Sequence, residues 1–314
     1  MTPFLSIVIP LYNKETFIAN TIKSVLQQTF QDFEIIVVDD GSTDNSYQIV
    51  SSLDNEKITL IKQENQGVSV ARNFGIQKAK ANYIALIDAD DIWYPNHLFE
   101  LKKQMDLFPE AGLYCNNYEV FHNEKVCKKA AFNFSYDTEC LIVEDYFKAS
   151  IINSVAWTSA IGFSKENFTN LGGFNTNYKT AQDLDLWIRF ALNYKVSFNP
   201  TITMSYKFYI DNSLSKNEKN YNYIRYDFIN SYNEEAQNNP SLKLYLDVNR
   251  YALALRSKLN GDKQLYLKVK KDIDFSNLNL KQRVVLIAPK SLLFTIKKLQ
   301  IFLLKNHIYL TVYK

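Results

Sequence analysis

Four short apolar runs, each separated from the next by a segment with helical spacing, constrain the fold of this chain more than any other feature. The runs are Leu5–Pro10, Glu34–Val38, Ile58–Ile61 and Tyr83–Ile87. Apolar strands of this kind are typical of a parallel sheet whose connecting helices cover both of its faces. Because such crossovers are right-handed, the pattern predicts an α/β fold with a mostly parallel, doubly wound sheet.

The segments after these runs predict the covering helices. They are expected at Tyr12–Gln28, Asn45–Leu53 and Val68–Ala79, and at Ile92–Leu101 with Asp91 as the N-cap. The chain has 314 residues, of which 46% are apolar. This composition excludes wholesale disorder.

Composition also divides the chain into two parts. Seven of its eight glycines lie in the first 173 residues, and the later part is rich in Asn, Lys and Tyr. We place the boundary near Pro200–Tyr209, which gives a first domain over residues 1–205 and a mainly helical C-terminal region over 206–314. Helices are expected there at Tyr221–Asn238 and Leu242–Leu259, separated by an Asn-Pro break.

Acidic residues follow two of the predicted strands. Asp39 and Asp40 end the second strand, and Asp88, Asp90 and Asp91 follow the fourth. The carboxyl ends of strands in an open α/β sheet meet at one edge, where ligands bind. The sequence contains no Gly-rich phosphate loop. Carboxylates without such a loop suit a divalent cation that also binds phosphate oxygens, so the pattern predicts a metal–nucleotide diphosphate.

Several segments around these acids resemble one family. The segments are Ser6–Asn13, Gln28–Asp44, Gly67–Asn73, Tyr83–Asp91, Leu171–Phe174 and Gln182–Trp187. Together they resemble the family 2 glycosyltransferases, which have the GT-A fold, and the likeness spans roughly residues 4–200. The resemblance implies inverting transfer of a sugar from a nucleotide-diphosphate donor, with a UDP-sugar favoured. It implies a glycan or lipid-linked saccharide acceptor in the biosynthesis of a polysaccharide such as O-antigen, capsule or lipopolysaccharide.

The resemblance also implies roles for individual residues. The nucleotide-binding residues are expected to be Pro10, Tyr12, Asp39, Asp40, Arg72 and Asp88. Asp88 and Asp90 form the DxD motif, with Asp90 ligating Mn²⁺ or Mg²⁺ and Asp88 contacting the ribose or the metal. Two of these residues have a structural alternative. Tyr12 either stacks on the base or packs in the core, and Arg72 either lies near the nucleotide or forms an ion pair on the helix surface.

The general base should be a carboxylate away from the DxD motif. Asp183 and Asp185 are the two candidates, but Asp185 lies four residues before Arg189, as in a helical ion pair. Asp183 has no such partner and matches the acid of the family's Glu-Asp motif, so we predict it to be the catalytic base. The chain departs from that motif by having Gln182 where Glu is common. The histidines, His97, His122 and His307, are expected at the surface or in packing.

The C-terminal segment is basic. Residues 281–314 contain seven Lys or Arg and no Asp or Glu. If Pro289–Asn306 is helical, Lys290, Lys297, Lys298 and Lys305 lie within an arc of roughly 100°. Two interpretations remain open, a helix that binds an anionic membrane surface and a helix that packs on the first domain. The lipid-linked acceptors implied by the resemblance favour the membrane.

Cysteine usage and charge indicate the remaining partners and the compartment. The odd number of cysteines, Cys115, Cys127 and Cys140, indicates neither a disulfide framework nor a zinc site. With no signal-peptide pattern at Met1–Pro10, we expect a cytoplasmic protein at the inner face of the cell membrane. The net charge of +3 arises from an acidic body and the basic tail, which does not favour nucleic acid. A catalytically silent nucleotide-sugar- or glycan-binding protein on the same scaffold is the alternative function, and the intact Asp88, Asp90 and Asp183 disfavour it.

Overall fold

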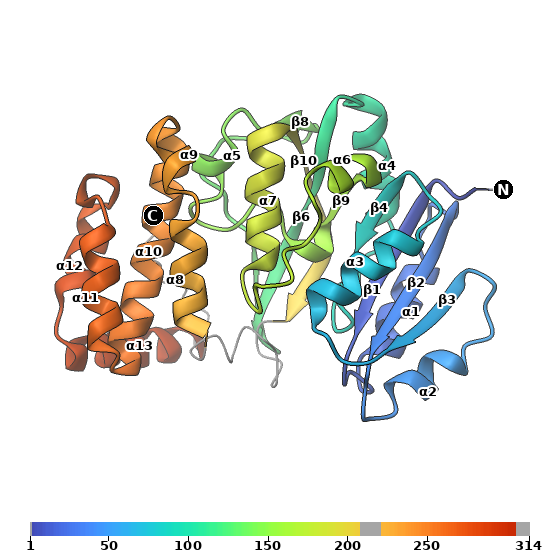
Figure 1. Ribbon diagram of the computed structural model, residues 1–314, viewed down its shortest axis with the longest axis horizontal. Coiled ribbons are helices and arrows are strands. Elements are labelled where there is room, and N and C mark those ends of the chain that lie inside the picture. The colour runs from blue at the N-terminus through green and yellow to red at the C-terminus, as the bar shows by residue number, and fades with distance from the viewer. Residues whose placement is uncertain (1, 208–220, 306–314) are drawn as a thin grey trace.

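A mixed sheet forms the centre of the computed structural model, which describes residues 2–207 and 221–305 (Figure 1). Its main strand order is β3-β2-β1-β4-β9-β6-β10-β5, with β7 paired to β6 and β8 to β10. In chain order the strands are β1 (Leu5–Leu11), β2 (Phe33–Asp40), β3 (Ile58–Gln63), β4 (Tyr83–Leu86), β5 (Ile92–Trp93), β6 (Ala111–Asn123), β7 (Val126–Lys129), β8 (Leu141–Ile142), β9 (Ile161–Ser164) and β10 (Lys195–Lys207).

The four predicted strands are adjacent and parallel. In register, Ile7 of β1 lies beside Ile35 of β2 on one side and Ala85 of β4 on the other. β9 runs antiparallel to both β4 and β6, whereas β10 is parallel to β6. The predicted doubly wound, mostly parallel sheet is therefore confirmed, with the antiparallel strand β9 in its middle.

Helices flank the sheet between these strands. They are α1 (Ile18–Leu26), α2 (Ser46–Ser51), α3 (Val68–Lys78), α4 (His97–Leu107), α5 (Tyr146–Ala149), η1 (Thr158–Ala160), α6 (Lys165–Asn170) and α7 (Gln182–Asn193). α1 begins six residues later than the predicted start at Tyr12. The intervening residues instead form a turn held to the loop after β2 and to the start of α2. Asn13 accepts from the Thr43 N–H at 2.8 Å, and the Lys14 N–H donates to Ser46 Oγ at 2.8 Å.

The helix predicted at Ile92–Leu101 is wrong in its first half, and so is Asp91 as its N-cap. Ile92 and Trp93 form β5, which pairs with β10. The helix starts only at His97, because Pro95 disfavours a helical conformation at the residue before it. Asp91 is buried beneath this turn and does not cap a helix.

Six α-helices and a short 3₁₀ segment follow the sheet in the described residues. They are α8 (Asn222–Asn230), α9 (Asn233–Gln237), α10 (Pro240–Asn260), α11 (Lys263–Asp272), η4 (Phe275–Asn277), α12 (Leu280–Ile287) and α13 (Lys290–Lys305). The helix expected at Tyr221–Asn238 is broken into α8 and α9. The Asn-Pro break is confirmed, since Asn239 caps α10 through the Leu242 N–H and Pro240 occupies its first turn.

The helical C-terminal region packs against the rest of the chain through α10, which contacts α5. The first part of the predicted boundary, near Pro200, lies within β10, and residue 209 lies outside the described residues. The division at residue 205 therefore stays a prediction. In the part of the chain that the structure describes, no helix is both long enough and apolar enough to cross a bilayer.

α3 lies very close to the sheet at Gly75, and a substitution at this position tests the packing. A Cβ on Gly75 would lie 2.5 Å from Val8 Cγ1 and 3.1 Å from Val38 Cγ2. We expect Gly75→Ala to lower the free energy of unfolding by about 1–2 kcal/mol, since the clash outweighs the gain in helix propensity. Chemical denaturation measures this effect. Gln77→Ala, at an exposed position of the same helix, is the control and should change stability by less than about 0.5 kcal/mol.

Candidate functional site

The predicted nucleotide-binding residues gather at the carboxyl ends of β1, β2 and β4. Pro10 lies within β1 beside Val38, and Tyr12 follows that strand directly. Tyr12 is 46% exposed, which excludes the interpretation of this ring as a core residue. An exposed aromatic ring beside the strand ends is available for stacking on a planar ligand.

The two acids that end β2 differ in their surroundings. Asp40 accepts from the side chain of Gln63 at 2.7 Å and from the N–H groups of Gln66 and Gly67 at 2.9 and 2.8 Å. It therefore holds the turn that leads into α3. Asp39 is fully buried, and neither of its carboxylate oxygens has a hydrogen-bond partner among the described residues. Of the two, Asp39 retains acceptor capacity for a ligand group.

Each acid of the DxD motif is paired with a base. Lys14 Nζ lies 2.5 Å from Asp90 Oδ2, and Arg72 Nη2 lies 2.5 Å from Asp88 Oδ1. The adjacent Asp91 has a pKa raised well above its usual range by burial and by the charges of Asp90 and Asp88. The two bases thus offset a concentration of negative charge. Sequence analysis missed Lys14, although its position directly after the exposed Tyr12-Asn13 turn was a usable signal.

Arg72 is held in the interior. Its side chain is 4% exposed, so the expected alternative is wrong about a surface location, although Arg72 does form an ion pair, with Asp88. The guanidinium carbon lies 5.3 Å from the centre of the Phe174 ring, and Asn73 fixes the Phe174 backbone through one hydrogen bond to its N–H and one to its C=O. Nε and Nη1 of Arg72 have no hydrogen-bond partner among the described residues. Arg72 thus presents buried, positively charged donors beside Asp88.

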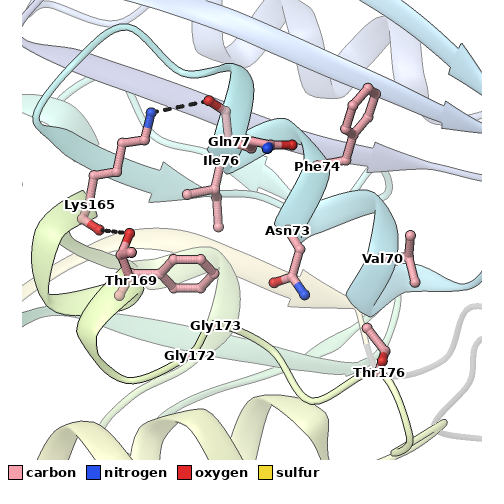
Figure 2. Close-up of a pocket in the computed structure, with 11 residues that line it drawn as sticks. Val70, Asn73, Phe74, Ile76, Gln77, Lys165, Thr169, Gly172, Gly173 and Thr176 are labelled. Carbon is pink, nitrogen blue, oxygen red and sulfur yellow. Dashed lines mark hydrogen bonds between the residues drawn. The ribbon is translucent and has the colours of Figure 1, made fainter.

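A pocket of about 660 Å³ lies between α3 and α6 (Figure 2). Asn73 extends toward the Gly172–Gly173 turn there. None of the predicted nucleotide-binding, metal-binding or catalytic residues lines this pocket. We therefore assign it no part in the chemistry and regard Asn73 as a support for Phe174.

Asp183 lies in the first turn of α7, after Ala181 in a left-handed conformation with φ of 61°. Its Oδ2 accepts from Thr158 Oγ1 at 3.4 Å and its Oδ1 from the Leu184 N–H at 2.9 Å. The next residue of η1, Ser159, accepts from the Asp88 N–H at 3.0 Å. Two consecutive residues therefore connect the predicted base to the DxD motif. Nothing in the sequence pattern indicated this link.

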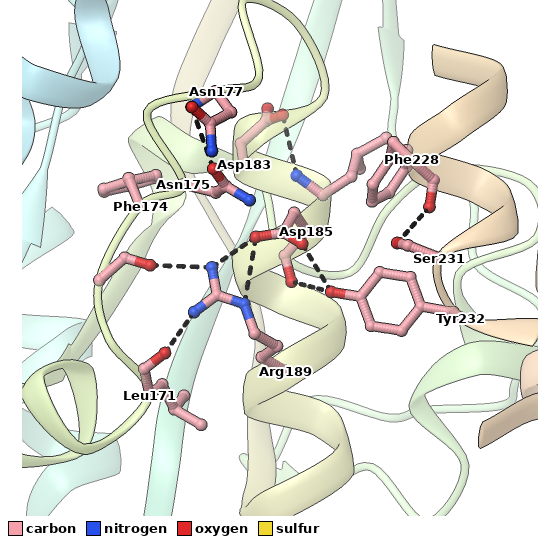
Figure 3. Close-up of polar contacts among 12 residues, drawn as sticks. Leu171, Phe174, Asn175, Asn177, Asp183, Asp185, Arg189, Phe228, Ser231 and Tyr232 are labelled. Atoms are coloured by element: carbon pink, nitrogen blue, oxygen red, sulfur yellow. Dashed lines mark hydrogen bonds and ion pairs between the residues drawn. The ribbon is translucent and has the colours of Figure 1, made fainter. Parts of the chain in front are cut away.

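Asp185 has the structural role that its spacing predicted (Figure 3). Arg189 donates to it at 2.5 and 3.1 Å, and also donates to the carbonyl groups of Leu171 and Gly173. Tyr232, from the C-terminal region, donates to Asp185 Oδ1 at 2.7 Å. Burial and the Asp185 charge raise the pKa of Tyr232, so its hydroxyl keeps the proton that it donates. Sequence analysis missed this long-range contact.

Gln182 directly precedes the predicted base. Gln182 is buried, and its Oε1 accepts no hydrogen bond from the described residues. An amide at this position avoids a third carboxylate beside Asp183 and Asp185.

His97 is buried and stacked on Trp93, and burial lowers its pKa to about 3. Its expected packing role is confirmed, whereas His307 lies outside the described residues.

With the site in place, comparison with known proteins identifies the family. The model of glycosyl transferase family 2 matches residues 6–171, more than half of the chain. The chain belongs to this family. It is similar to the putative colanic acid biosynthesis glycosyl transferase WcaA of Escherichia coli (strain K12), with 35% identity over 61% of this chain and 67% of WcaA.

Two further relatives match only part of their own length. An uncharacterized glycosyltransferase of Rickettsia felis is 26% identical over 81% of this chain and 42% of that protein. Glycosyltransferase GlyG of Streptococcus pneumoniae serotype 4 is 37% identical over 38% of this chain and 40% of GlyG. The family match and these relatives support a glycosyltransferase.

Solved structures agree on the fold. S. aureus TarS residues 1–349 superimpose with a TM-score of 0.65 and 16% identity, over 96% of this chain and 92% of that one. The mannosyltransferase PcManGT from Pyrobaculum calidifontis, in complex with GDP-Man and Mn²⁺, gives a TM-score of 0.60 and 17% identity, over 96% and 81%. The predicted GT-A fold is confirmed.

The contact between Tyr232 and Asp185 predicts a loss of stability on its removal. Tyr232→Phe deletes a hydrogen bond to a buried carboxylate, which should lower the free energy of unfolding by about 1.5–3 kcal/mol. Urea denaturation measures the change. The control Tyr223→Phe removes the hydroxyl of a tyrosine that is 52% exposed and should have little effect. Equal stabilities for the two variants would contradict the assigned role.

Proposed function

We propose that this chain is an inverting, metal-dependent glycosyltransferase that moves a sugar from a nucleotide-diphosphate donor, with UDP-sugar favoured, to a saccharide acceptor. The observation that supports the proposal is a pair of hydrogen bonds through the consecutive residues Thr158 and Ser159, which links the Asp183 carboxylate to the backbone N–H of Asp88. A metal-binding pair of acids and a separate carboxylate base are what such a transfer requires.

The donor would bind along the strand ends. Tyr12 would stack on the base, with Pro10 beside it, and Asp39 would accept from a nucleoside hydroxyl or base N–H. Asp40 would act by holding the turn before α3. Arg72 and Lys14, which pair with Asp88 and Asp90, would contribute two positive charges near the diphosphate.

The acids suit a hard divalent cation. The described residues contain no cluster of three or more His, Cys, Asp or Glu side chains arranged for a metal. Two carboxylates are nevertheless sufficient for Mg²⁺ or Mn²⁺ when phosphate oxygens complete the shell, so Asp88 and Asp90 fit this role. When bound, the cation would supply Lewis-acid stabilisation of the charge that develops on the diphosphate. Asp90 would exchange its contact with Lys14 for that cation.

Asp183 would accept the proton of the acceptor hydroxyl as that oxygen attacks the anomeric carbon. The bond from this carbon to the diphosphate breaks on the opposite face, so the configuration inverts. Thr158 orients the Asp183 carboxylate, and the first turn of α7 favours its negative charge. His97 is buried and keeps a low pKa, so it is not an alternative base.

The acceptor class is part of the proposal. WcaA is named for colanic acid biosynthesis, and a TarS structure is described in complex with UDP-GlcNAc. The name of WcaA supports a role in polysaccharide biosynthesis. We propose in addition that the acceptor is a glycan or lipid-linked saccharide and that the enzyme is cytoplasmic and works at the membrane.

Ligand-induced thermal shifts test the donor and the metal. We expect one nucleotide among UDP, GDP, dTDP and CMP, with UDP favoured, to stabilise the protein in the presence of Mn²⁺. A ligand at about 100 times its Kd adds about 2.7 kcal/mol to the free energy of unfolding. Asp90→Asn should lose the part of the shift that needs Mn²⁺, whereas Asp106→Asn, at an exposed position, should retain it. No shift with any nucleotide would favour a silent binding protein.

Removal of the base should separate catalysis from binding. Asp183→Asn keeps the size of the side chain but removes the proton acceptor, so we expect transfer to fall by about 10²–10⁴-fold. The nucleotide-induced thermal shift should stay unchanged. Sugar transfer is measured with the donor that the thermal shifts select. Full turnover by Asp183→Asn would contradict the assignment of the base.

A further inference from the structure

Large apolar side chains are exposed on the last two described helices. Leu280, Val284 and Ile287 of α12 are 77%, 57% and 60% exposed. On α13, the exposed residues include Leu292, Phe294, Leu299 and Ile301. The other exposed large apolar side chains of the described chain are dispersed over other elements: Tyr12, Phe99, Leu107, Tyr223 and Leu267. At about 100° per residue, Leu292 and Leu299 lie on the opposite side of α13 from Phe294 and Ile301. We call the side of α13 that carries Phe294 and Ile301 the C-terminal face.

α13 is attached to the protein by a narrow contact. Leu293 is its only buried large apolar residue among those described, and the helix contacts α10. Phe294 and Ile301 are seven residues apart and so lie on one side of the helix. Phe294 and Ile301 are 44% and 49% exposed in the described part of the chain.

Basic side chains lie among the apolar residues of this face. Lys290, Phe294, Lys297 and Ile301 are three or four residues apart in turn, so they lie on the same side of the helix. Lys290 Nζ lies 5.6 Å from the centre of the Phe294 ring. Lys297 and Lys298 are exposed. The sequence contains no Asp or Glu after Asp274. An apolar surface with interspersed lysines and no acids is complementary to an anionic partner that also offers an apolar phase.

We propose that the C-terminal face of α13 docks on the surface of an anionic lipid bilayer. Phe294 and Ile301 enter the boundary between head groups and acyl chains, while the lysine ammonium groups contact lipid phosphates. A second copy of the chain fits less well, because a symmetric contact through this face would bring the lysines of both copies together.

The location of the face agrees with the proposed reaction. In Figure 1, α13 lies at the lower edge of the molecule, toward which the carboxyl ends of β1 and β2 also point. Docking through α13 would thus bring this edge of the sheet near the bilayer. If the proposed function is correct, a lipid-linked acceptor would be presented to Asp183 there; the docking itself requires no sugar transfer.

Vesicle flotation with the full chain tests the proposal. The probe is vesicles of equimolar phosphatidylcholine and phosphatidylglycerol, compared with vesicles of phosphatidylcholine alone. We expect the protein to float with the anionic vesicles only and to be released as salt is raised, because salt screens the lysines. Absence of binding to anionic vesicles at low salt would overturn the proposal.

Two sets of variants identify the surface. Since each lysine near an anionic surface contributes about fivefold in affinity, Lys290→Glu with Lys297→Glu and Lys298→Glu should lower partitioning by at least about 100-fold. The control Lys125→Glu with Lys128→Glu and Lys129→Glu makes the same charge change at exposed positions near β7 and should float like the unmodified chain. Equal losses in both triple variants would show non-specific charge attraction and overturn the assignment.

The apolar part is tested in the same way. Phe294→Ser with Ile301→Ser should reduce flotation at least about 10-fold, whereas Phe99→Ser with Leu107→Ser, on exposed positions of α4, should not. Unchanged melting temperatures establish that all variants fold. Ultracentrifugation without lipid examines the competing occupant. A dimer that Phe294→Ser with Ile301→Ser dissociates would overturn the lipid proposal in favour of a second copy.

Discussion

Concentrated negative charge at one edge of the sheet is the constraint on which the site depends. Asp39, Asp88, Asp90 and Asp91 lie where the strands end, and two of them are neutralised by Lys14 and Arg72. Each base comes from a different connection of the α/β fold, so the charges balance only when β1, α3 and β4 are in place. The same contacts that stabilise the fold therefore arrange the groups that a metal and a diphosphate would contact.

Support for this edge comes from residues distant in sequence. Phe174 lies against Arg72, Ser159 fixes the backbone of Asp88, and Thr158 contacts Asp183. Tyr232 of the helical region then stabilises the helix that carries Asp183 through its contact with Asp185. The site is thus assembled from the sheet, one 3₁₀ turn, α7 and the C-terminal helices.

The sequence predicted the parts of this structure that depend on local pattern. Apolar runs gave the parallel strands, and the spacing of Asp185 and Arg189 gave their ion pair. The short β5 was missed because its pairing with β10, far along the chain, overrides the helical pattern after Asp91. Lys14, Ser159 and Tyr232 were missed for a related reason: their roles arise from tertiary contacts that leave no periodicity or motif. The nucleotide-binding and catalytic roles themselves remain predictions.

The hydrogen bond from Tyr232 to Asp185 limits how freely the C-terminal region can be replaced by that of a relative. The Rickettsia felis relative and GlyG match this chain over 42% and 40% of their own length. In this chain the C-terminal helices provide a hydroxyl to the same helix that carries Asp183. A hybrid that joins this sheet to a C-terminal region without an equivalent hydroxyl would leave the buried Asp185 carboxylate short of one donor. An exchange of the C-terminal region should therefore keep Asp185 and Tyr232 together.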